Sequence, residues 1–166
     1  MVAWWYCNSD NWQGQTVTNV MGAILRLLAG SEIPDDIRKA FLGGTRPPLL
    51  SLMRILRTTI ASLPQVFICI DALDEFPASN LPELLESLRE ILREFPKTRI
   101  FLTGRPHVKE VIQRHFVEAV AISICPNPND LRNYVRMSLG SSPLLGLMDG
   151  DLGGKIGEIM EKMGDR

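Results

Sequence analysis

The sequence predicts an α/β fold with a parallel β-sheet, and three observations support this. Short apolar runs of strand length alternate with segments whose apolar residues recur every three or four positions, as on one face of a helix. Residues 66–70 are apolar on both faces of the pleat, which is typical of a strand covered by helices on both sides. The 166 residues, 45% hydrophobic and 22% charged, suit a folded domain of ordinary size.

The first half of the chain is predicted to contain two strands and two helices. Residues 2–7 are aromatic and β-branched and end at a turn-rich cluster, which indicates a strand that enters a loop. Two amphipathic helices follow, over 17–28 and 49–60, and a polar connection over 31–48 separates them. Residues 66–70 form the second strand.

The second half continues the alternation of strands and helices. Asn80 is placed to cap a helix, with Glu83 three residues later as in a capping box, and Pro96 ends that helix. The other predicted elements are a strand over 99–103, a short helix over 108–112, a strand over 119–124, and helices from 127 and over 152–163. Strands that alternate with helices imply right-handed crossovers and a parallel sheet.

Charged residues follow two of the predicted strands directly. Asp71, Asp74 and Glu75 come after the strand over 66–70, and Arg105 comes after the strand over 99–103. Ligands of such sheets collect at the carboxyl ends of the strands. Clustered carboxylates repel one another unless a cation such as Mg²⁺ offsets them, and an arginine suits a phosphate. Each motif alone could be structural, as a helix cap or a surface salt bridge, but together they favour a nucleotide site.

This reasoning gives a geometric prediction: Asp71 and Arg105 lie at the same edge of the sheet, on parallel neighbouring strands. Other chemistry is disfavoured. A net charge of -1 gives no attraction to nucleic acid or acidic lipid, and no apolar run is long enough to cross a membrane. We expect no signal peptide and a cytoplasmic location. The three cysteines, Cys7, Cys69 and Cys125, are expected to be buried free thiols.

Two strings make a family resemblance visible. VFICIDALDE, residues 66–75, resembles the extended Walker B motif of NACHT domains, and RIFLTGRP, residues 99–106, resembles their sensor strand. The opening residues are similar to fungal NACHT proteins of the STAND class, described as having a nephrocystin 3-like N-terminal domain. The resemblance implies a three-layer P-loop NTPase-like fold and a nucleotide-driven switch. Its partners would be further copies of itself, or effector or repeat domains.

The same resemblance implies roles for single residues. Asp71 would hold Mg²⁺ through water, and Glu75, with help from Asp74, would orient or activate the attacking water. Arg105 would sense the terminal phosphate of ATP or GTP. The phosphate-binding pattern G-x-x-x-x-G-K-[ST] has no match in the sequence, and the nearest imitation, at 149–156, lacks the first glycine and the final hydroxyl residue.

We therefore expect a fragment of a NACHT-type domain, over 1–140, that lacks the central P-loop strand, followed over 141–166 by the start of a helical region. Such a fragment is expected to be inactive alone, because phosphoryl transfer depends on positioning and electrostatics. The alternative is a non-enzymatic interaction module with the same fold. The strand over 119–124 is expected either to stay apart from the sheet or to close against the 99–103 strand.

Overall fold

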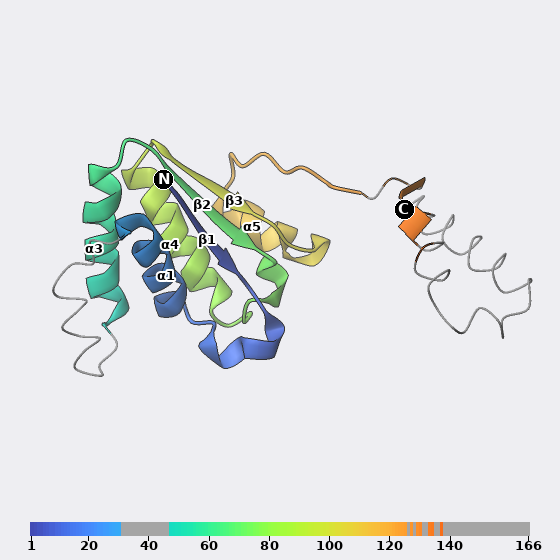
Figure 1. Ribbon diagram of the computed structural model, residues 1–166, viewed down its shortest axis with the longest axis horizontal. Helices are drawn as coiled ribbons and strands as arrows, with labels where there is room; N and C mark the ends of the chain where they lie inside the picture. Colours follow the sequence, from blue (N-terminus) through green and yellow to red (C-terminus); the bar gives the residue numbers. More distant parts are fainter. Residues whose placement is uncertain (31–46, 126, 128, 131–132, 135–136, 138–166) are drawn as a thin grey trace, which may run out of the picture. The chain divides into compact units, whose positions relative to one another are not determined.

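The computed structural model describes residues 1–30, 47–125, 127, 129–130, 133–134 and 137. The chain divides into two compact units, Met1–Ala119 and Val120–Arg166, and the helices and strands below belong to the first. Its centre is a three-stranded parallel sheet in the order β1-β2-β3 (Figure 1). The strands are β1 (Val2–Tyr6), β2 (Val66–Asp71) and β3 (Thr98–Leu102). The predicted α/β class and parallel sheet are confirmed.

The register of the sheet places residues of the three strands in rows. Trp4 pairs with Cys69, which pairs with Phe101, and two residues further along Tyr6 pairs with Asp71. All three strands therefore end at one edge, and the residues that follow them lie together there. The predicted parallel pairing of the strands that precede Asp71 and Arg105 is confirmed.

Four α-helices accompany the sheet in the described residues: α1 (Val17–Ala29), α3 (Leu49–Ser62), α4 (Leu81–Glu94) and α5 (Lys109–His115). Three short 3-10 turns lie between them and the strands: η1 (Ser9–Gly14), η2 (Leu73–Glu75) and η3 (Pro106–Val108). α1 begins where the Thr16 side chain accepts a hydrogen bond from the Asn19 amide, and it ends at Gly30, whose φ of 60° suits glycine.

The start of α4 agrees with the prediction in position but not in mechanism. Asn80 is the N-cap residue, yet its side chain caps no helical amide, so the predicted capping box is wrong. The side-chain Nδ2 of Asn80 instead donates to the Gln15 carbonyl, at 3.4 Å, and its Oδ1 accepts from the Ser79 hydroxyl, at 3.1 Å. A tertiary contact has therefore replaced the local cap.

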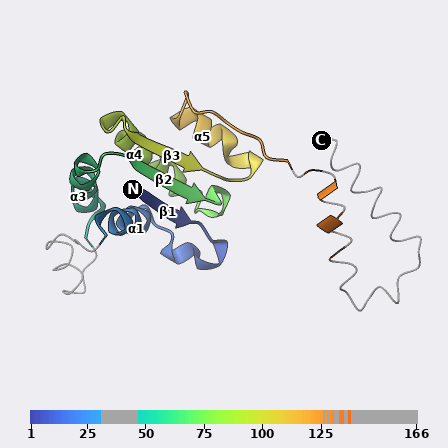
Figure 2. The ribbon, with the colours of Figure 1, turned by 45° about the horizontal axis from the view of Figure 1, so that its top comes forward.

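The core lies on one side of the sheet. α1, α3 and α4 gather there (Figure 2). Their buried leucines and isoleucines pack with Ala3, Ile68 and Ile70. The other face carries Val2, Trp4, Tyr6 and Phe101, with exposed fractions of 58%, 61%, 53% and 58%. We call these four residues the open face.

The open face corrects one expectation. β2 was predicted to be buried on both sides, but Phe67 and Cys69, which point away from α1 and α4, are only half-buried. In the described residues the helices thus form one layer against the sheet.

Residues 119–124 form no strand, so that prediction is wrong. Within the described residues β3 pairs only with β2, so these residues add no fourth strand to the sheet. An apolar, β-branched sequence is not enough, because a strand's amides and carbonyls need a partner strand. Cys125, predicted to be buried, is exposed, and Cys69 is half-buried, whereas Cys7 is buried. Residues 31–46 of the connection predicted over 31–48 lie outside the described residues, and so does the helix predicted over 152–163.

Candidate functional site

The candidate site lies at the carboxyl edge of β2 and β3. β2 ends at Asp71, which is exposed, and Arg105 follows β3 after two intervening residues. Two loops meet here, one over 71–75 and one over 103–105. The position follows from the apolar strands, because both are anchored in the core and both deliver their polar residues to the same edge.

Thr103 joins the two loops. Its hydroxyl donates to Oδ1 of Asp71 and accepts from the Ala72 amide at 3.0 Å. Its carbonyl accepts from the Leu73 amide at 2.9 Å, and its own amide donates to the Ile70 carbonyl at 3.0 Å. Ala72 is the non-glycine residue of the described chain with positive φ, at 54°, and this left-handed turn directs the chain into η2.

Asp74 and Arg105 are held together at two points. Oδ1 of Asp74 accepts from the Arg105 backbone amide at 3.1 Å, and Oδ2 lies 3.2 Å from Arg105 Nε. The Asp74 side chain is only 8% exposed, whereas that of Arg105 is 74% exposed. A carboxylate so buried is unfavourable without a partner, so this pairing explains how Asp74 is accommodated.

Glu75 contacts the loop that follows β1. Its Oε2 accepts from the Ser9 amide at 2.9 Å. Gln15, buried at 3% exposure, donates through Nε2 to the Asn8 carbonyl at 2.6 Å and to the Glu75 carbonyl at 3.2 Å. Its Oε1 accepts from the Asn8 amide at 3.2 Å. The three hydrogen bonds of Gln15 thus fix the end of β1 against η2.

Cys7 shows the electrostatic character of this edge. Burial raises the pKa of its thiol from 9.0 to about 12, and the negative charges of Glu75, Asp71 and Asp74 act in the same direction. The Cys7 amide donates to the Asp71 carbonyl at 3.0 Å, which places the residue beside the acidic loop. A buried thiol in a negative field stays protonated and is a poor nucleophile.

The acidic residues do not converge as metal ligands. Over the part of the chain that the structure describes, no three His, Cys, Asp or Glu side chains gather around a possible ion position. Asp71 is exposed, and in these residues its Oδ2 takes no hydrogen bond. A single carboxylate fits Mg²⁺, which keeps most of its water and is commonly shared with substrate phosphates. The donor set is compatible with Mg²⁺ that arrives with a nucleotide.

Three parts of this site are not predicted by the sequence patterns: Thr103, Gln15 and the Ser9 amide. Thr103 carries a signal, since a hydroxyl residue directly precedes the Gly-Arg pair at a strand end. Gln15 and Ser9 lie in a polar turn and act through partners about 60 residues away, at Glu75, so no local pattern identifies them.

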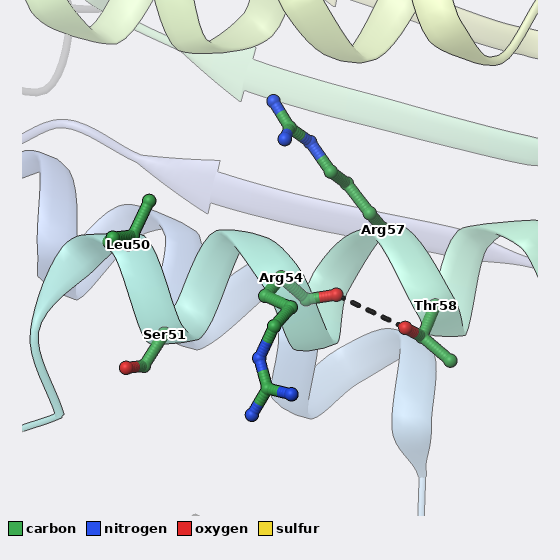
Figure 3. A pocket seen from close by; sticks show the side chains of 5 residues that line it. All are labelled: Leu50, Ser51, Arg54, Arg57 and Thr58. Atoms are coloured by element: carbon green, nitrogen blue, oxygen red, sulfur yellow. Dashed lines mark hydrogen bonds between the residues drawn. The ribbon is translucent and has the colours of Figure 1, made fainter.

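A separate hollow lies on the outer side of α3, lined by Leu50, Ser51, Arg54, Arg57 and Thr58 (Figure 3). The Thr58 hydroxyl donates to the Arg54 carbonyl of the same helix, at 3.2 Å. This hollow shares no residue with the strand-end site, and a single helix supplies its lining. Ligand sites usually draw polar groups from several elements, so we do not regard it as the functional site.

A family model described as "Nephrocystin 3, N-terminal" matches residues 1–105. The matched range runs from β1 to Arg105 and so includes Asp71, Asp74 and Glu75. No curated protein and no solved structure matches the chain. No helix in the described residues has the length and hydropathy needed to cross a membrane.

Proposed function

We propose that this chain, which belongs to the nephrocystin 3 N-terminal family, supplies the magnesium and phosphate-sensing edge of a NACHT-type NTP-binding domain in a signalling switch. One observation carries the proposal: Asp71 and Arg105 come from parallel neighbouring strands and lie at one sheet edge, where Thr103 joins their loops. Such an edge is where open α/β sheets bind nucleotides.

The proposed roles follow from exposure and hydrogen bonding. Asp71, exposed and with one free oxygen, would hold water-bound Mg²⁺, which would supply positive charge beside the phosphates of ATP or GTP. Arg105, 74% exposed, would contact the terminal phosphate. Glu75 would orient the attacking water, and its contact with Ser9 would break or adjust when it does so.

A lysine-bearing phosphate loop is absent from the printed sequence, which limits what this chain does by itself. Backbone amides and a lysine make most of the phosphate contacts in such loops. We therefore propose that the chain alone hydrolyses no NTP and binds Mg-nucleotide weakly. In the complete switch, located in the cytoplasm, nucleotide would gate self-association or contact with effector or repeat domains.

The test is titration of the chain with MgATP and MgGTP by calorimetry, together with a phosphate-release assay. Weak binding that Asp71→Ala and removal of Mg²⁺ both abolish supports the proposal. Glu110→Gln is the control, because the Glu110 side chain is 83% exposed and pairs with Arg114 on the same helix. Binding that is insensitive to Asp71→Ala would contradict it. Tight binding or turnover would refute the role given to the missing loop.

The second candidate is a non-enzymatic interaction module, and the open face favours it. Four apolar side chains on one sheet face, each more than half exposed, form a surface suited to protein contact. The two candidates differ in the same titration: the module binds no nucleotide at any concentration, with or without Mg²⁺.

A further inference from the structure

The first step concerns the charge of Asp74. Its side chain is 8% exposed, and both of its oxygens are engaged by one residue, Arg105: Oδ1 by the backbone amide at 3.1 Å and Oδ2 by Nε at 3.2 Å. An acidic group that activates water needs an oxygen open to that water within hydrogen-bond reach. Asp74 offers none in this arrangement, which is unlike the helper role that resemblance implies.

The second step concerns what Arg105 keeps available. Asp74 uses the Nε edge of the guanidinium, and within the described residues the two Nη groups take no ion-pair partner. The side chain is 74% exposed. A guanidinium can bind an oxyanion through two parallel N–H bonds. When its Nε edge is held, the end that bears both Nη groups remains for this bidentate contact.

The third step concerns the turn that brings the two residues together. A Cβ at Gly104 would lie 3.5 Å from the Asp74 amide nitrogen and from Oδ1, and 2.8 Å from Val108 Cγ2. The backbone of the arginine loop therefore runs close against Asp74, and only glycine leaves space beside Val108. The pairing is part of a closely packed turn and is not a chance surface contact.

We infer that Asp74 is a positioning residue, which holds Arg105 by its backbone and Nε so that both Nη groups face outward for an oxyanion, and that it does not activate water. The identity of that oxyanion as a nucleotide phosphate rests on the proposed function. The positioning itself concerns the protein without ligand, so it can be measured separately.

The experiment uses solution NMR of the whole chain, with hydrogen exchange followed at the Arg105 backbone amide and at Nε–H. Asp74→Asn keeps an oxygen that accepts from the backbone amide but loses the charge that pairs with Nε. The variant places an NH2 group, a donor, where an oxygen accepts from Nε, so the charge-assisted hydrogen bond is lost. Exchange at Nε–H should accelerate by at least about tenfold, while exchange at the backbone amide changes little. Asp74→Ala should accelerate both.

Two controls separate positioning from general loss of stability. Amides of β2 report global opening, and a merely structural role of Asp74 would accelerate them together with Arg105. Glu110→Gln removes the partner of an exposed pair, Arg114 at 3.8 Å, and should leave Arg105 unchanged. If Asp74→Ala unfolds, the isosteric Asp74→Asn carries the test. Unchanged Nε–H exchange in Asp74→Asn overturns the inference.

A separate measurement, the response of the Arg105 signals to MgATP, tests the proposed function. Addition of MgATP to the wild-type chain should shift the Arg105 Nη signals, and Asp74→Asn should weaken that response. If MgATP shifts nothing in the wild type while the exchange pattern holds, the nucleotide proposal fails and the positioning of Arg105 by Asp74 stands.

Discussion

We predict that the chain self-associates through the open face and that replacement of Trp4 and Phe101 by lysine makes it monomeric. These two residues flank Cys69 in the central row of the open face, with exposed fractions of 61% and 58%. An aromatic side chain buries about 150–250 Å² when covered, so these two and Tyr6, 53% exposed, present roughly 250–420 Å² together. Patches of this size on monomers commonly mark contact sites.

The free energy involved is large enough to drive association. At about 25 cal/mol per Å², covering the three aromatic side chains contributes roughly 6–10 kcal/mol per copy, or about 12–20 kcal/mol for two copies. Association costs on the order of 4–15 kcal/mol, a range that overlaps this gain, so we expect weak dimers whose population rises with protein concentration. The double lysine variant removes about two thirds of the apolar area and adds four like charges per dimer, so its dissociation constant should rise by at least about a hundredfold.

Sedimentation velocity over a wide concentration range is the assay, with far-UV circular dichroism to confirm that each variant is folded. Leu50→Lys is the matched control, because Leu50 is 83% exposed but lies on α3, away from the sheet face. It should leave the sedimentation of the chain unchanged. A wild-type chain that is monomeric at all concentrations and unfolds cooperatively would refute this reasoning, and would favour a self-sufficient interaction module.

Three further predictions concern the site and its support. Gly104→Ala should lower the free energy of unfolding, measured with urea, by about 1–3 kcal/mol, because the added Cβ would lie 2.8 Å from Val108 Cγ2. Gly22→Ala within α1 should raise the free energy of unfolding by about 0.5–1 kcal/mol, and equal effects of the two variants would contradict the packing argument. Gln15→Ala should lower the free energy of unfolding by about 1–3 kcal/mol, because the three hydrogen bonds of this buried side chain are lost. A urea midpoint equal to that of the wild type would refute the bridging role of Gln15. The pKa of the Cys7 thiol is 9.0 in the unfolded chain and about 12 in the folded chain, so folding favours the protonated thiol. Its contribution to the free energy of unfolding is complete below pH 9 and is lost between pH 9 and 12, by about 1.4 kcal/mol per pH unit. In Cys7→Ala the free energy of unfolding should lack this dependence on pH.

Local patterns predicted the helices and strands of the first unit well. The helix predicted over 17–28 is α1, Val17–Ala29, and the strand over 66–70 is β2, Val66–Asp71. The apolar periodicity that predicts each element lies within its own consecutive residues, because one side of each element faces the core. The strand over 119–124 failed for the opposite reason. A strand is stabilised by its neighbours, and apolar alternation does not tell whether a neighbour is available.

The edge at which the site lies was also predictable, but its contacts were not. Parallel strands must end together, so Asp71 and Arg105 could be placed at one edge from their order alone. The partner of each side chain depends on rotamers and loop conformation. Asp74 and Arg105 are 31 residues apart, and no spacing rule joins them. No local pattern predicts that the Asn80 side chain donates to the Gln15 carbonyl instead of capping the helix.

The acidic cluster shows why its pattern alone is weaker evidence than its place in the fold. The sequence pattern predicts that the adjacent carboxylates need a cation, yet the protein offers each one a different compensation. Asp71 accepts from the Thr103 hydroxyl, Asp74 pairs with Arg105, and Glu75 accepts from the Ser9 amide. Their mutual repulsion therefore does not require a metal ion. Support for a nucleotide site comes instead from the exposed side chains of Asp71 and Arg105, which share the carboxyl edge of neighbouring parallel strands.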